Sequence, residues 1–216
     1  MDEIAANRYP ALDWKQDLRV SQRLFAEHEG FGEGTASVCI AVERYLMRSA
    51  LAFRKLLVQR VLTDEVINAD WRVLTYPCTK APDERWWFEG TVDMENLHHF
   101  VRHYDLGRPR KESLRLQRLA DFLIHSFVFA VWPKDGGSYE QARFFFNSDR
   151  NRGKLVYEMQ VTDFKAIVEE VLDDEVVYVS IDKSTGEFHQ HNLAWKHRQR
   201  EGRGRPDLSE GMNGGR

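Results

Sequence analysis

A short polar segment after an apolar one carries the most suggestive chemistry in this chain. Residues 143–148 (RFFFNS) are followed by Asp149, Arg150, Asn151, Arg152 and Gly153. Two arginines on a short loop can hold a carboxylate or a phosphate through paired hydrogen bonds, and the neighbouring aspartate can orient one of them or hold a cation. A polar hairpin turn, with glycine supplying positive φ, would use similar residues. Both interpretations stay open at this stage.

The same region offers a candidate catalytic group in His125, which lies in the apolar segment 120–132. A nucleophilic triad needs a hydroxyl near an imidazole and a carboxylate that orients the ring. Ser126 points away from its neighbour, so Ser148 and Asp149 are the better partners. No GxSxG or SxxK motif is present. We therefore expect His125 to be buried and hydrogen-bonded to a backbone carbonyl or to a polar group of the next strand.

A basic stripe lies on the strongest predicted helix. Arg44, Arg48 and Lys55 fall within a narrow arc at 100° per residue. Such an arc could receive a phosphate backbone or an acidic partner. A solvated face with salt bridges is the favoured interpretation. If the loop 149–153 binds an anion, we expect a concavity lined by Arg150 or Arg152, with His125 or the Arg48 face nearby.

Two histidine pairs have spacings that suit a metal ion. His99 and His103 share a face if residues 96–104 form a helix, and His189 and His191 share a face of a strand. Neither pair has a third ligand at a diagnostic spacing, and HExxH is absent, so a polar surface is favoured. The sequence also lacks a P-loop and a GxGxxG motif, and we expect no cofactor.

Length and composition predict one soluble domain. The chain has 216 residues, 42% of them hydrophobic, and includes 13 Phe, which suffices for a substantial core. The net charge of −3 creates no global field for nucleic acid, so such a partner would need a local patch. Apolar residues 122–132 are too few to span a bilayer. Cys39 and Cys78 form no disulfide framework or CxxC pair, which favours a reducing, cytoplasmic location without membrane contact.

The pattern of apolar residues and turn signals predicts an α+β fold with a mainly antiparallel sheet and N-terminal helices packed on one face. Its core is a β-meander, a helix with Thr162 as N-cap, and a β-hairpin. Helices are expected at residues 11–28, 37–62, 96–104, 113–126 and 163–173, and strands at 71–77, 85–92, 127–132, 143–148, 155–160, 175–182 and 186–191.

We expect a single domain over residues 1–195, with an N-terminal helical arm over about residues 1–65. Residues 196–216 contain almost no apolar side chain, so this basic, glycine-rich tail should be disordered in isolation. It could serve as an arm for nucleic acid or an acidic partner, but a solubilising role is slightly favoured.

Three stretches of the sequence resemble those of an uncharacterised family of small bacterial proteins: residues 48–56 (RSALAFRKL), 124–129 (IHSFVF) and 146–152 (FNSDRNR). The similarity covers about half of the chain in scattered pieces. It implies that these stretches belong to one architecture, and it implies no activity.

Together these features favour a non-catalytic cytosolic binding or regulatory protein. Its Arg-rich loop would grip an anionic partner, either an acidic protein or a nucleic acid. The alternative is an enzyme that acts on a phosphoester or a nucleic acid with His125, Asp149 and Arg150. The binding protein is favoured because each candidate catalytic set lacks a member.

Overall fold

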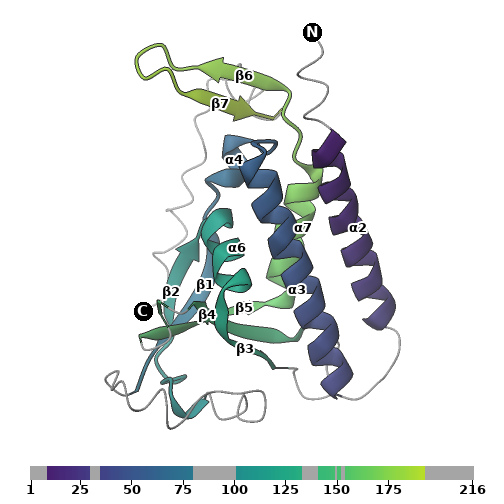
Figure 1. Cartoon of the computed structure of the whole chain (residues 1–216). Coiled ribbons are helices and arrows are strands. Elements are labelled where there is room, and N and C mark those ends of the chain that lie inside the picture. Colours follow the sequence, from purple (N-terminus) through teal and green to yellow (C-terminus); the bar gives the residue numbers. More distant parts are fainter. Residues whose placement is uncertain are drawn as a thin grey trace, which may run out of the picture.

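The computed structural model describes residues 9–29, 35–79, 101–132, 141–148, 150–151 and 154–192. It confirms the α+β class: N-terminal helices and two later helices pack on one face of an antiparallel sheet, and a β-hairpin lies beyond the end of the helical layer (Figure 1). No helix within these ranges is long and apolar enough to cross a membrane.

The sheet has five strands in the order β2-β1-β5-β4-β3, and every pairing is antiparallel. The strands are β1 (Trp71–Pro77), β2 (Arg110–Leu114), β3 (Ser126–Trp132), β4 (Arg143–Ser148) and β5 (Leu155–Gln160). The last three form the predicted meander. Strand alternation directs Phe144 and Phe146 into the main core and Phe145 to the opposite face, where a smaller apolar cluster forms.

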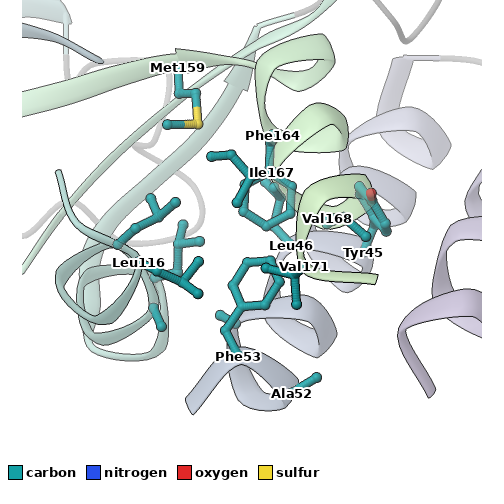
Figure 2. Close-up of a cluster of buried hydrophobic side chains, with 14 of the residues drawn as sticks. Tyr45, Leu46, Ala52, Phe53, Leu116, Met159, Phe164, Ile167, Val168 and Val171 are labelled. Atoms are coloured by element: carbon teal, nitrogen blue, oxygen red, sulfur yellow. The ribbon is translucent and has the colours of Figure 1, made fainter. Parts of the chain in front are cut away.

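Four helices bury their apolar stripes against this sheet and against each other: α2 (Tyr9–Glu29), α3 (Thr35–Val58), α6 (Leu116–Ile124) and α7 (Val161–Asp173). Aromatic rings connect the layers, since Phe164 of α7 contacts Tyr45 and Phe53 of α3 with centroids 5.7 and 5.8 Å apart. Figure 2 shows Phe53, Leu46 and Val171 gathered in this core, where all three are fully buried. The helices of the predicted arm therefore share the main core.

Helix α3 ends at Val58, four residues before the predicted end at residue 62. Arg60 takes the left-handed conformation with φ 51°, and two hydrogen bonds close the helix end around it. Arg60 N donates to Leu57 O and Val61 N donates to Leu56 O, which is the Schellman pattern. The chain then forms the single turn α4 (Asp64–Ile67) before β1 begins.

Some predicted elements differ from the structure. Residues 110–114 form strand β2, so the helix predicted over 113–126 begins only at Leu116. Strand β2 is polar and lacks the apolar alternation that marks a strand in the sequence. Its pairing with β1 therefore decides its conformation. Gln160, not Thr162, is the N-cap of α7. Val101 and Arg102 lie in a 3₁₀ turn, contrary to the helix predicted over 96–104. The strand predicted at 85–92 and the tail 196–216 lie outside the described residues.

The C-terminal hairpin consists of β6 (Tyr178–Ile181) and β7 (Phe188–His191), as predicted but with shorter strands. Its loop uses the Asp182 carboxylate, which accepts hydrogen bonds from Ser184, and Gly186, which has φ 75°. The hairpin contacts α4 through two side-chain pairs. His189 Nδ1 lies 2.8 Å from Asp64 Oδ2, and His191 Nδ1 lies 3.3 Å from Glu65 Oε1.

Removing the ring of Phe53 should destabilise the protein strongly, because a fully buried aromatic side chain leaves a cavity. We expect Phe53→Ala to lower the free energy of unfolding by about 3–5 kcal/mol in urea denaturation. Leu51→Ala, on the same helix but 48% exposed, is the matched control, and it should cost less than about 1 kcal/mol. Equal losses in the two variants would show that the helix is packed differently.

Replacing Arg60 by glycine should stabilise the protein, because glycine adopts positive φ without a steric penalty. We expect Arg60→Gly to raise the free energy of unfolding by about 0.5–1 kcal/mol, after allowing for the greater entropy of the unfolded chain. Arg60→Ala removes the same charge but keeps the Cβ atom, so it should give no such gain. A gain of equal size in both variants would assign the effect to charge instead of backbone conformation.

Candidate anion-binding groove

A groove of about 960 Å³ opens where the end of α3, the α4–β1 connection, α6 and the β4–β5 turn come together. We call it the arginine groove. Its walls carry mostly polar and charged side chains: Arg54, Asn68, Asp70, Ser113, Arg115, Gln117, Arg118, Asp121, His125, Ser148, Arg150 and Asn151, with Ile67 and Phe122. Four of these residues are arginines and two are aspartates, so the lining carries an excess of positive charge.

Arg118 is held in place by aromatic contacts. Its guanidinium lies over the Phe122 ring, 5.0 Å from the centroid, and donates a hydrogen bond to the Tyr157 hydroxyl at 3.5 Å. Phe122 packs against Tyr157 in turn, with centroids 5.0 Å apart. Asn151 of the β4–β5 turn donates to the same hydroxyl at 3.4 Å. Burial raises the pKa of Tyr157, which favours the neutral phenol that these contacts use.

Arg54 lies at the centre of a second set of contacts. Its Nη1 atom is 3.5 Å from Asp121 Oδ1 and 3.3 Å from His125 Nε2. Both partners belong to the α6 segment, because His125 is the C-cap residue of that helix. Arg115, the N-cap residue of α6, donates to Asn68 Oδ1 at 3.3 Å and so connects the helix to the α4–β1 connection.

The positive charges of the groove are only partly neutralised. Arg54 pairs with Asp121, while Asp70 accepts a hydrogen bond from the Ser113 hydroxyl. Within the described ranges, Arg115, Arg118 and Arg150 have no carboxylate at ion-pair distance. Counted over the described residues, three guanidinium groups therefore line one groove with hydrogen-bonding capacity left for an anion.

Ser148 lines the groove at the end of β4. The residue is only 7% exposed, and its Oγ atom has no hydrogen-bond partner among the described residues. A buried hydroxyl without a hydrogen-bond partner lowers the stability of the folded protein. No hydrogen bond between Ser148 and His125 is present in the described part of the chain.

The structure brings together three of the residues singled out in the sequence. His125, Ser148 and Arg150 all line the arginine groove. The expectation of a buried His125 is wrong: the side chain is exposed, and its partner is Arg54. The physical reason is its position at the C-cap of α6, where the chain turns from the core into β3. Asp149 and Arg152 lie outside the described residues.

The basic stripe of α3 does not reach this site. Arg44, Arg48 and Lys55 are exposed, and none of them lines the groove. Lys55 lies over the Trp14 ring, with Nζ 5.8 Å from the centroid, so it contacts α2. Arg54, the residue before Lys55, points to the other side of the helix and enters the groove.

The histidine pairs proposed as metal ligands have other surroundings. His189 and His191 face the carboxylates of α4, and His191 Nε2 also lies 3.1 Å from Ser180 Oγ. His103 lies beside the Cys78–Tyr104 bridge, and His99 is not among the described residues. Where side chains are described, no group of three or more His, Cys, Asp and Glu residues is arranged to hold a metal ion.

Sequence reasoning missed Arg54, Arg115 and Arg118. A signal for the last two was present, because Arg115, Arg118, Phe122 and His125 recur at spacings of three, four and three, which places them on one helical face. Arg54 had no such signal, since its contact with His125 joins residues 71 positions apart.

A second buried polar network lies on the opposite face of the sheet and is structural. Asn147 accepts a hydrogen bond from Val128 N at the irregularity in β3 and donates to the Tyr104 hydroxyl, each at 2.9 Å. Tyr76 donates to Glu158 Oε2 at 2.7 Å. Burial, together with this hydrogen bond, raises the pKa of Tyr76 to about 12. Within the described residues these groups satisfy each other's hydrogen bonds.

Comparisons with protein-family models, with curated proteins and with solved structures find no match to this chain. The geometry of the groove is therefore the evidence for its role.

The contact between Arg54 and His125 predicts the tautomer of the histidine. A guanidinium can only donate, so His125 Nε2 must accept and the proton of the neutral ring must lie on Nδ1. Long-range ¹H–¹⁵N NMR at mildly alkaline pH should show this Nδ1–H form, with the signal assigned by its loss in His125→Gln. Arg54→Ala should shift His125 toward the Nε2–H form. A ring that is Nε2–H in the unmodified protein would contradict the contact.

Proposed function

We propose that this protein is a binding protein that holds an anionic group of a partner in the arginine groove. One observation carries the proposal: Arg115, Arg118 and Arg150 line one groove without carboxylate partners in the described part of the chain. Like charges repel, and an anion bound between converging arginines relieves this repulsion, so their convergence favours a bound anion.

The arginines suit the recognition of a carboxylate or a phosphate. A guanidinium offers two parallel N–H donors that match the two oxygens of such a group. Arg118 is stacked on Phe122 and Arg115 is bonded to Asn68, so both lose less side-chain entropy on binding than free arginines would.

A second candidate function is hydrolysis of a phosphoester, because His125 and Ser148 line the same groove as the arginines. A general base needs a free nitrogen directed at the nucleophile. His125 Nε2 instead accepts from Arg54, and no hydrogen bond connects His125 to Ser148. Binding without catalysis therefore has the better support.

The proposal is tested by titrating the full chain with tripolyphosphate at low ionic strength in a calorimeter. We expect measurable binding that Arg115→Ala combined with Arg150→Ala weakens at least about tenfold, because each lost charge-assisted contact is worth about 1.5 kcal/mol or more. The double variant should keep its stability within about 1 kcal/mol, since both side chains are exposed.

Arg44→Ala combined with Arg48→Ala is the matched control. It removes the same charge from exposed positions outside the groove, and it should change the affinity less than about twofold. If both double variants lose the same affinity for tripolyphosphate, binding depends on the net charge of the protein, and the arginine groove is not the binding site. Release of phosphate from tripolyphosphate or from p-nitrophenyl phosphate, lost in His125→Gln, would instead establish the hydrolytic function.

A further inference from the structure

A second groove continues the arginine groove along α6. It has a volume of about 770 Å³ and lies between the end of α3, α6 and the C-terminal hairpin. The two grooves share Arg54, Ile67, Gln117 and Asp121 as walls. The two grooves therefore adjoin, and we call the pair, from Arg150 in the β4–β5 turn to Phe188 in β7, the furrow.

The hairpin end of the furrow carries exposed apolar side chains among charged ones of both signs, whereas the other end is basic. Val58 and Phe188 line it and are 74% and 63% exposed, and Leu57 and Ile67 lie beside them. Large apolar side chains with this exposure are unfavourable in water and mark a surface that binds another molecule when they gather at one place. The furrow thus pairs a positively charged end with an end that carries exposed apolar side chains.

We propose that the furrow binds an extended, acidic peptide segment of a partner protein. The acidic side chains lie at the arginine end, and an apolar side chain lies between Val58 and Phe188. This inference rests on the proposed function and adds the class of partner. Charge complementarity decides the direction of the peptide, because Arg115, Arg118 and Arg150 all belong to one end of the furrow.

A polypeptide also fits the polar groups along the furrow. Gln117 lies where the two grooves meet, is exposed, and has an amide that can pair with a peptide N–H and C=O. The Asn151 amide nitrogen donates to Tyr157, and among the described residues its side-chain oxygen has no hydrogen-bond partner. Main-chain hydrogen bonds of this kind hold extended peptides, and the pockets at the two ends supply the specificity.

Nucleic acid is a poorer match for the whole furrow. A phosphate backbone needs positive charge along its full path and aromatic faces on which bases stack. The hairpin end instead has mixed charge, since the carboxylates of Asp64 and Glu187 lie there beside Arg60. In the arginine groove, Phe122 is already covered by Arg118 and packed against Tyr157.

The test is selection from a displayed library of random peptides of about twelve residues, which span roughly 40 Å when extended, against the full chain. We expect the selected sequences to share a cluster of Asp and Glu residues followed or preceded by an aliphatic or aromatic residue. A labelled selected peptide is then measured by fluorescence anisotropy. Arg115→Ala with Arg150→Ala should weaken it at least about tenfold, and Val58→Ser with Phe188→Ser at least about fivefold.

Ile40→Ser combined with Leu51→Ser is the matched control, because both residues are about half exposed and lie outside both grooves. It should leave peptide affinity within about twofold. Selected peptides without acidic residues, or peptides insensitive to the Val58 and Phe188 substitutions, would overturn the inference.

A parallel binding measurement with single-stranded oligothymidine tests whether the partner is a nucleic acid. Binding of oligothymidine that the arginine substitutions abolish, with no acidic peptide selected, would replace the peptide by a nucleic acid. Tripolyphosphate binding at the arginine end without any selected peptide would overturn this inference and leave the proposed function intact. Peptides that bind only at the hairpin end would overturn this inference, and the absence of tripolyphosphate binding would overturn the proposed function as well.

Discussion

A buried carboxylate at the end of α7 joins three parts of this protein. Asp174 accepts hydrogen bonds from Thr63 N at 2.7 Å and from Thr63 Oγ1 at 2.6 Å, and its main-chain carbonyl accepts from Lys15 Nζ. Burial lowers the pKa of Lys15, and the charge of Asp174 opposes that shift. Buried charges are tolerated only when their hydrogen bonds are satisfied, so these contacts require one relative position of α2, α4 and α7.

The position of α4 then determines both ends of the furrow. Asn68, the C-cap residue of α4, accepts the hydrogen bond of Arg115 and so places one wall of the arginine groove. Asp64 faces His189 and Glu65 faces His191, and these pairs place the hairpin that closes the other end. A two-stranded hairpin is only marginally stable alone, which makes its contacts with α4 decisive for its position.

The aromatic core supplies the rigidity that a binding site needs. Phe144 and Phe146 of β4 pack under α6 and α7, so the strand that ends at Ser148 cannot shift without disturbing the whole layer. Arg118 rests on Phe122, which belongs to the same packed region. Arg54 and Arg118 therefore project from helices whose geometry is maintained by burial, and a site built on such elements is better organised than one built on loops alone.

Much of the architecture was predictable from local sequence. The meander from β3 to β5, the helices α2, α3 and α7 and the hairpin all follow from apolar periodicity and turn residues, which act over a few positions. Residues 110–114 could not be assigned in this way, because their strand exists through pairing with β1. The end of α3 depended on the conformation of Arg60, which no propensity requires.

By itself the sequence determined the fold class and the meander, and it identified His125, Ser148 and Arg150 as candidate site residues. Only the tertiary structure decided that these residues share a groove with Arg54, Arg115 and Arg118, because the order β2-β1-β5-β4-β3 and the packing of α3 against α6 bring together positions that are far apart along the chain.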